Sequence, residues 1–250
     1  MSSAPDGSAR LRVLVLQHEE PTPPGHVTGW LAEHDASVET LRIDIDDREV
    51  DPTRYDLIVS LGSEFAAFDD TNPFVPREAW LMRTAIDADV PVLGLCFGGQ
   101  MLARVLGGEV YRGTRSEIGW LPVTSHDPEL VPEGPWFQWH FDSFTVPPGA
   151  TLIAESDAGP QAFVAGRSLG LQFHPEVTTE IMDDWVREYR HELDADGVAP
   201  DALLEETKRR AGESRRMALQ LFDRYLSDVA RLAHGEPEEP EAPPSDRRAG

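Results

Sequence analysis

The chain has 250 residues, 40% of them hydrophobic, which is enough to bury the core of one large domain with an appendage. Its formal net charge of -23 would repel nucleic acid and anionic membrane surfaces, so neither is expected as a partner. Cys96 is the only cysteine, which excludes an intrachain disulfide and a metal site built from several cysteines of one chain.

No apolar run approaches the roughly 20 residues that a helix needs to span a bilayer. The first residues, MSSAPDGSAR, lack the basic and apolar stretches of a signal peptide, which predicts a cytoplasmic protein. Residues 1–10 and 236–250 are rich in Pro, Ser, Ala and charged residues, a composition typical of disordered termini.

Strand-like and helix-like segments alternate over residues 11–107. The strand-like segments are apolar or alternating runs: 11–18, 37–44, 56–62 and 91–95. The helix-like segments between and after them are 27–34, 76–88 and 97–107. This alternation with short joints predicts an α/β fold, with a mostly parallel central sheet and helices on both of its faces.

The pattern then changes to short β segments separated by turns, which we expect to extend the sheet as antiparallel strands and a surface ribbon. These segments are 108–113, 118–125, 151–156, 161–166 and 168–174. From residue 178 the chain is predicted to be helical, with apolar residues at helical spacing in 182–193 and 213–232. The expected division is a main domain over 11–190 and a C-terminal helical extension over 191–235.

Cys96 lies at a predicted strand-to-helix turn, in the segment GLCFGGQ. A nucleophile on such a turn needs glycine on both sides, and Gly94 and Gly98 supply it. The following helix N-terminus favours the thiolate, and the Phe97 N–H is placed to stabilise an oxyanion beside it. A lone buried cysteine can also be inert, and α/β-hydrolase turns share this glycine pattern. A base must therefore be found elsewhere in the chain.

His174 in the segment LQFHPE supplies that base. We expect it to end a strand, and Pro175 restrains it to an extended conformation. In extended chain, residues i and i+2 project to the same side, so Glu176 can hold one ring nitrogen of His174 while the other faces Cys96. An α/β-hydrolase would instead place its acid before the histidine. The remaining histidines without such a companion are expected to be structural: His18, His26, His34, His126 and His191.

Together, GLCFGGQ and LQFHPE resemble the class I, triad-type glutamine amidotransferase family over roughly residues 11–185. The segments EIGW (117–120) and QWHFDSF (138–144) are most similar to stand-alone, GMP-synthase-amidotransferase-like members. The resemblance implies a flavodoxin-like α/β fold, with Cys96 as nucleophile, His174 as base and Glu176 as its partner. It implies no metal and no organic cofactor.

The resemblance also implies a second oxyanion donor in the turn after the third strand, where Gly62 and Ser63 match the family's glycine-rich positions. We expect the backbone N–H groups of Ser63 and Phe97 to form the oxyanion hole. Substrate contacts are expected at Gly62, at Gln100 one helical turn after the nucleophile, and at His140 and Asp142. Phe141 stands where relatives commonly carry glycine, which changes the predicted shape of the pocket.

Three functions remain open on this basis. The leading hypothesis is a stand-alone enzyme that hydrolyses or transfers the γ-glutamyl group of small amides or peptides through a thioester on Cys96. The second is a glutaminase subunit that supplies ammonia to a separate synthetase. The third is a regulatory module with an inactive triad, which the intact Cys96, His174 and Glu176 disfavour.

Overall fold

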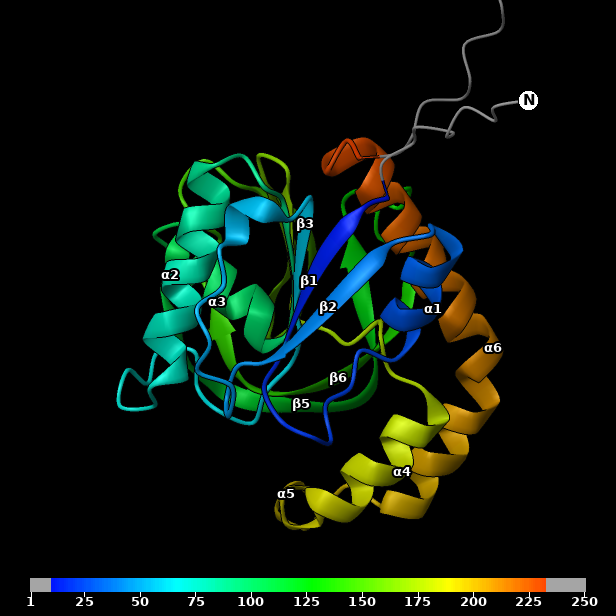
Figure 1. The fold of residues 1–250 in the computed structure, drawn as a ribbon. Coiled ribbons are helices and arrows are strands. Elements are labelled where there is room, and N and C mark those ends of the chain that lie inside the picture. The colour runs from blue at the N-terminus through cyan, green and yellow to red at the C-terminus, as the bar shows by residue number, and fades with distance from the viewer. Residues whose placement is uncertain (1–9, 233–250) are drawn as a thin grey trace, which may run out of the picture.

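The structure is a computed structural model that describes residues 10–232. The segments predicted to be disordered, 1–10 and 236–250, lie outside the described residues except for Arg10. One nine-stranded sheet forms the centre, in the order β2-β1-β3-β4-β9-β8-β7-β5-β6 (Figure 1). Its first five strands are parallel: β2 (Ser37–Arg42), β1 (Arg12–Gln17), β3 (Leu57–Ser60), β4 (Val92–Leu95) and β9 (Ser168–Leu171). This is the flavodoxin-like strand order that the resemblance implies. The expectation of an antiparallel strand within 168–174 is wrong, because β9 runs parallel to β4.

The other four strands continue the sheet as antiparallel neighbours: β5 (Val110–Ser125), β6 (Gly134–Phe144), β7 (Thr151–Ser156) and β8 (Gly159–Ala165). The two predicted segments within β5 are one long strand, whose pairing with β6 shifts register between Arg112 and Glu117. β6 was not among the predicted strands. Most of its residues are buried on both faces, so its sequence shows no alternation of apolar and polar positions.

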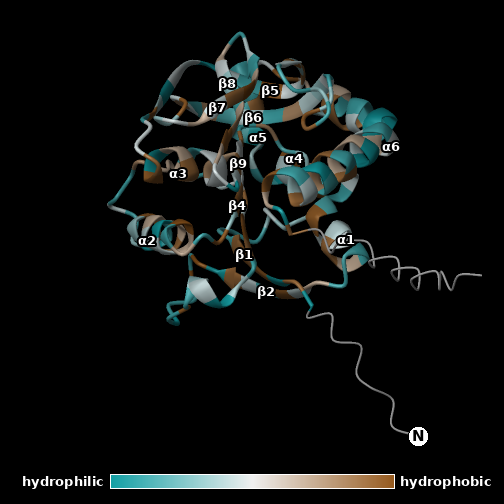
Figure 2. Ribbon diagram, turned by 90° about the horizontal axis from the view of Figure 1, so that it is seen from above, coloured by the Kyte–Doolittle hydropathy of each residue, from teal (hydrophilic) through white to brown (hydrophobic). Residues whose placement is uncertain are grey.

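Helices cover both faces of the parallel half of the sheet (Figure 2). α2 (Phe74–Asp87) and α3 (Phe97–Val105) lie on one face, and α1 (His26–Glu33) and α6 (Pro200–Arg224) lie on the other. Successive side chains of β1 point to opposite faces of the sheet. Val13 and Val15 pack in the cluster with α1 and α6, and Leu14 and Leu16 pack in the cluster with α2 and α3.

The C-terminal part differs in detail from the prediction. The single helix expected over 182–193 is two helices, α4 (Thr179–Glu188) and α5 (Arg190–Asp196), separated at Tyr189. The last helix begins at Pro200, well before the predicted start, because its first half carries mostly polar residues that weaken the apolar pattern. A short π-helical turn, Tyr225–Val229, follows it. Within residues 10–232, no helix combines the length and the apolar character needed to cross a membrane.

Candidate active site

Three loops that leave adjacent parallel strands bring the predicted catalytic residues together. Cys96 directly follows β4, Gly62 follows β3, and His174 follows β9. β4 pairs with β3 on one side and with β9 on the other. Because the carboxyl ends of parallel strands meet at one edge of the sheet, all three residues line one pocket. The predicted strand end at His174 is wrong, since β9 stops at Leu171.

Cys96 occupies the sharp turn that its glycine neighbours predict. Its backbone has φ 49° and ψ -105°, a conformation that side-chain-bearing residues rarely adopt and that stores strain at a functional position. A Cβ on Gly94 would lie 2.4 Å from the Gly98 carbonyl oxygen, and one on Gly98 would lie 2.3 Å from the Ser60 carbonyl oxygen. Close backbone packing therefore requires both glycines.

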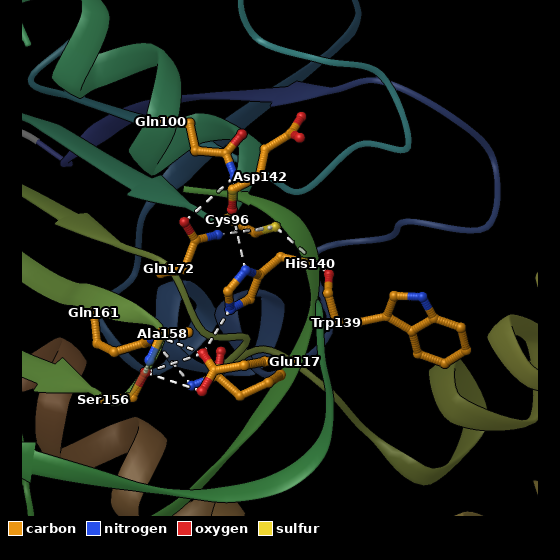
Figure 3. Close-up of polar contacts among 11 residues, drawn as sticks. Cys96, Gln100, Glu117, Trp139, His140, Asp142, Ser156, Ala158, Gln161 and Gln172 are labelled. Atoms are coloured by element: carbon orange, nitrogen blue, oxygen red, sulfur yellow. Dashed lines mark hydrogen bonds and ion pairs between the residues drawn. The ribbon is translucent and has the colours of Figure 1, made fainter. Parts of the chain in front are cut away.

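The Cys96 sulfur lies at the start of α3, where the helix dipole favours a negative charge. The residue is 5% exposed, at the base of the pocket. Gln172 Nε2 donates to the sulfur at 3.7 Å, and the Trp139 carbonyl oxygen lies 3.9 Å from it (Figure 3). The thiol is thus accessible to a ligand in the pocket and is in contact with a neutral hydrogen-bond donor.

His174 and Glu176 form a buried pair, 4% and 2% exposed. His174 Nδ1 lies 2.7 Å from Glu176 Oε1, as the i and i+2 spacing predicts. The edge of the Trp185 ring packs against the imidazole, with 4.9 Å between the ring centroids, and restricts its rotation. Among the described residues, His174 Nε2 is buried and has no hydrogen-bond partner.

The pKa of His174 depends on opposing effects. Burial alone would lower it, because the charged imidazolium loses its hydration. The negative charges of Glu176 and of Cys96 outweigh burial and raise the pKa of His174 to about 10. The arrangement thus favours a protonated imidazole at neutral pH.

Gly62 is the point where the turn after β3 meets both reactive side chains. A Cβ on Gly62 would lie 2.8 Å from His174 Cε1 and 3.7 Å from Cys96 Cβ, so the imidazole and the thiol lie on the same face of this residue. The Leu61 carbonyl accepts a hydrogen bond from the Gly98 N–H at 3.1 Å. This bond ties the turn to the first turn of α3, which holds the nucleophile.

The two predicted oxyanion donors come from these tied segments. Phe97 is the first residue of α3, where backbone N–H groups have no carbonyl partner inside the helix. Ser63 lines the pocket next to Gly62. Its N–H shares a trans peptide with the Gly62 carbonyl, which points to the buried His18, so the N–H points the opposite way.

The predicted substrate contacts also lie in this pocket, joined by hydrogen bonds (Figure 3). Gln100 Nε2 donates to the Asp142 carbonyl at 3.2 Å, and to Gln172 Oε1 at 3.3 Å. His140 Nδ1 donates to the same Asp142 carbonyl at 3.1 Å. Phe141, the departure from the family pattern, lines the mouth of the pocket beneath the Arg112 guanidinium, which lies 4.8 Å from the ring centroid.

Several residues of the site were not assigned from the sequence. Gln172 contacts Cys96, and its position two residues before His174 is the spacing that would have placed it on the same side. Arg112 forms a 3.1 Å ion pair with Asp142 at the pocket mouth. Glu117 lies 3.1 Å from His140 Nε2, and both are buried. Burial raises and the His140 contact lowers the pKa of Glu117, and the net effect is a lowered pKa.

His18 has an acidic companion that was not predicted. Its Nε2 lies 2.6 Å from Glu78 Oε2, and both side chains are completely buried. His34 and His126 also have acidic partners, Asp223 and Glu155, at the surface. The expectation that these histidines lack a companion is therefore wrong, because the partners come from distant elements rather than from neighbouring positions.

The pocket encloses about 600 Å³ of empty space, counted out to its open mouth. Its walls combine the reactive groups with aromatic and acidic side chains: Phe65, Trp139, Phe141, Trp185, Tyr189, Glu64 and Glu192. Within the described part of the chain, no three acidic, histidine or cysteine side chains gather as a metal site would require.

The sequence model of the family described as "Glutamine amidotransferase class-I" matches residues 27–188. The chain belongs to the class I glutamine amidotransferase family. A solved glutamine amidotransferase from Thermotoga maritima is 33% identical to this amidotransferase, with a TM-score of 0.80, and the match covers 87% of this chain and 99% of that one. For a glutamine amidotransferase from Methylobacillus flagellatus, the identity is 28%, the TM-score 0.81, and the coverage 92% and 100%.

The curated relatives of this amidotransferase include much longer proteins. The GMP synthase [glutamine-hydrolyzing] of Thermus thermophilus is 38% identical over 147 residues, which are 50% of this chain and 28% of that protein. The corresponding protein of Ralstonia pickettii is 32% identical over 59% of this chain and 29% of its own length. Family membership confirms the predicted α/β fold and the assignment to glutamine amide chemistry.

Proposed function

We propose that this amidotransferase hydrolyses or transfers the γ-glutamyl group of small amides through a thioester on Cys96. One observation carries the proposal: His174 is held by Glu176 through Nδ1, while its other ring nitrogen is buried and unpaired within the described structure, on the face of Gly62 that also bears Cys96. A base oriented by a carboxylate and aimed at a nucleophile is the arrangement that acyl transfer requires.

The reaction begins from the thiolate and the imidazolium. The Cys96 sulfur attacks the γ-carbonyl carbon, and the N–H groups of Ser63 and Phe97 stabilise the oxyanion that forms. His174 then donates its proton to the leaving nitrogen, the C–N bond breaks, and a γ-glutamyl thioester remains. Water attacks the thioester while His174 accepts its proton, and the departing thiolate is restored.

The glutamyl part of the substrate is proposed to lie against Gly62, Gln100, His140 and Asp142. Gln100, His140 and Asp142 are already joined by hydrogen bonds, so this part of the pocket wall is in place before a substrate arrives. The open mouth, with Phe141 and Arg112, leaves room for a substituent on the amide nitrogen. The proposal therefore includes γ-glutamyl amines and peptides as substrates alongside glutamine.

A second function is favoured by the comparisons. Relatives named as glutamine-hydrolysing GMP synthases extend far beyond the part that this chain matches. The chain would then be a glutaminase that releases ammonia to a separate synthetase. In that case, glutamine hydrolysis would rise on addition of the partner protein.

Mass spectrometry of the acid-quenched protein tests the main proposal. The protein is mixed with glutamine, with γ-glutamyl amines and with γ-glutamyl peptides, and the mass of the Cys96 peptide is measured over time. We expect a γ-glutamyl adduct on Cys96 that is absent in Cys96→Ser. An adduct on another residue, or hydrolysis that survives in Cys96→Ser, would exclude the thioester mechanism.

A further inference from the structure

A second buried histidine–glutamate pair lies beneath the oxyanion turn. His18 follows β1, and Glu78 lies on α2. His18 Nδ1 donates to the Gly62 carbonyl at 3.0 Å, and His18 Nε2 lies 2.6 Å from Glu78 Oε2. Ser60 Oγ donates to the other carboxylate oxygen at 2.6 Å. His18, Glu78 and Ser60 are completely buried, so solvent does not weaken the bonds among them.

The contacts of His18 influence its protonation state. A carbonyl oxygen only accepts, so Nδ1 of His18 carries a proton. Glu78 Oε1 accepts from Ser60 Oγ, and Glu78 Oε2 lies 2.6 Å from His18 Nε2. Burial lowers the pKa of His18, but the charges of Glu78 and Glu19 and the hydrogen bonds raise it overall. The raised pKa of His18 favours its protonated form, with Nδ1 bonded to the Gly62 carbonyl and Nε2 to Glu78.

Both predicted oxyanion donors depend on contacts with His18. The His18 ring packs on the Phe97 ring with 4.6 Å between centroids, and Phe97 supplies one donor N–H. The Gly62 carbonyl that His18 binds shares its peptide plane with the Ser63 N–H, the other donor. Glu19, the next residue, accepts from Ser63 Oγ at 2.7 Å and fixes the outer side of the same turn.

We propose that His18 and Glu78 are positioning residues for the oxyanion hole, which hold the Gly62–Ser63 peptide so that its N–H faces the developing negative charge. A charged donor on the carbonyl also polarises the peptide and makes its N–H a stronger donor. This inference rests on the proposed thioester mechanism. Neither residue touches the substrate, and both act through the backbone of the turn.

Two rates on the same thiol separate this role from a purely structural one. Alkylation of Cys96 by iodoacetamide displaces iodide and forms no oxyanion, whereas acylation by a γ-glutamyl amide must form one. Loss of the positioning contact should therefore slow acylation and leave alkylation unchanged. A general loosening of the site would change both rates.

Three variants test the contact. His18→Leu removes the donor and should reduce kcat about 100-fold, approaching the loss seen when an oxyanion donor is deleted. His18→Asn keeps a neutral donor near the Nδ1 position, and Glu78→Gln keeps the shape but removes the charge, so each should lose about 10-fold in kcat with little change in KM. If His18→Leu does not fold, His18→Asn and Glu78→Gln still test the contact, because each leaves a polar side chain in the buried position.

Tyr225→Phe is the matched control, because Tyr225 is also fully buried and lies in the opposite helical layer. It should keep the kcat of the original protein. Folded His18→Asn and Glu78→Gln proteins with unchanged kcat would overturn the inference, as would equal losses in acylation and alkylation. If the unaltered protein forms no γ-glutamyl adduct, the proposed thioester mechanism is wrong. If it forms the adduct but the His18 and Glu78 variants keep their kcat, only the positioning role is wrong.

Discussion

The two buried histidine–glutamate pairs on either side of the Gly62 turn differ in how completely they are bonded. In the His18–Glu78 pair, both ring nitrogens and both carboxylate oxygens have partners. In the His174–Glu176 pair, Nε2 and one carboxylate oxygen are buried without a partner among the described residues. Unpaired buried polar atoms are costly, and those of His174 and Glu176 lie where the proposed chemistry would use them.

The largest expected effect follows from removing the unpaired nitrogen. His174→Asn should lower kcat by about 10⁴-fold, because the thiolate loses its counter-ion and the leaving nitrogen loses its acid. Steady-state hydrolysis of the substrate found by adduct formation measures this loss. A loss of less than about 10-fold would mean that another group moves the proton. The unpaired Nε2 of His174 would then not distinguish a catalytic pair from a supporting one.

Adding a side chain at Gly62, which lies between the two pairs, should have the next largest effect on kcat. The Cβ of Gly62→Ala would press on His174 Cε1, 2.8 Å away, and rotate the imidazole from the thiol, so kcat should fall about 100-fold. Gly212→Ala on α6 is the control, because its Cβ meets no described atom within 4 Å.

The control should keep full activity and unfold at a higher temperature, since alanine stabilises a helix by about 0.5–1 kcal/mol over glycine. Equal activity of the two alanine variants would show that the imidazole has more freedom than the packing indicates.

Glu176→Gln should have a smaller effect, about 10-fold on kcat, because the amide oxygen still accepts from Nδ1 but carries no charge. The pKa of His174 is raised to about 10 in the folded protein. Protonation of this residue therefore stabilises the fold fully below its unfolded pKa of about 6.5, and the contribution disappears as the pH rises towards 10.

The difference in melting temperature between the original protein and Glu176→Gln should accordingly be largest near pH 6 and vanish near pH 10. Thermal unfolding across this range measures it. A difference that grows with pH would have the wrong sign for a raised histidine pKa.

The smallest effect is expected at the third buried pair, His140–Glu117, which is bonded on both ring nitrogens. Glu117→Gln should raise KM about threefold and leave kcat almost unchanged, because His140 borders the pocket at a distance from the bond that breaks. If Glu117→Gln instead lowered kcat and left KM unchanged, His140 would act at the reacting atoms rather than in substrate binding.

Neighbouring residues alone predicted two parts of the site, and the family resemblance implied the others. Cys96 is framed by its own glycines, and His174 and Glu176 are two positions apart, so local geometry determines how they lie. The partners of His18 and His140 are 60 and 23 positions away, on other elements, and no periodic pattern connects them. Their pairing depends on how α2 and β5 pack, which only the folded chain shows.

Helices and strands that depend on distant contacts were likewise hard to predict from the sequence. Most of the parallel strands are short apolar runs, and their alternation with helices could be predicted from the sequence. β6 is buried along most of its length and lacks any alternation. The first half of α6 is mainly polar, and only Leu203 and Thr207 there are buried. Both elements owe their structure to tertiary contacts.

The packing of α6 determines where this chain can be truncated without exposing its core. α6 lies outside the family match, yet Met217, Ala218, Leu221 and Phe222 share a hydrophobic cluster with β1 and β3, and Trp120 donates to Thr207 at 2.9 Å. A fragment ending at residue 188 would open that cluster to water on the side that α6 covers. The end of the family match at residue 188 is therefore not the end of the folded core, which extends to α6.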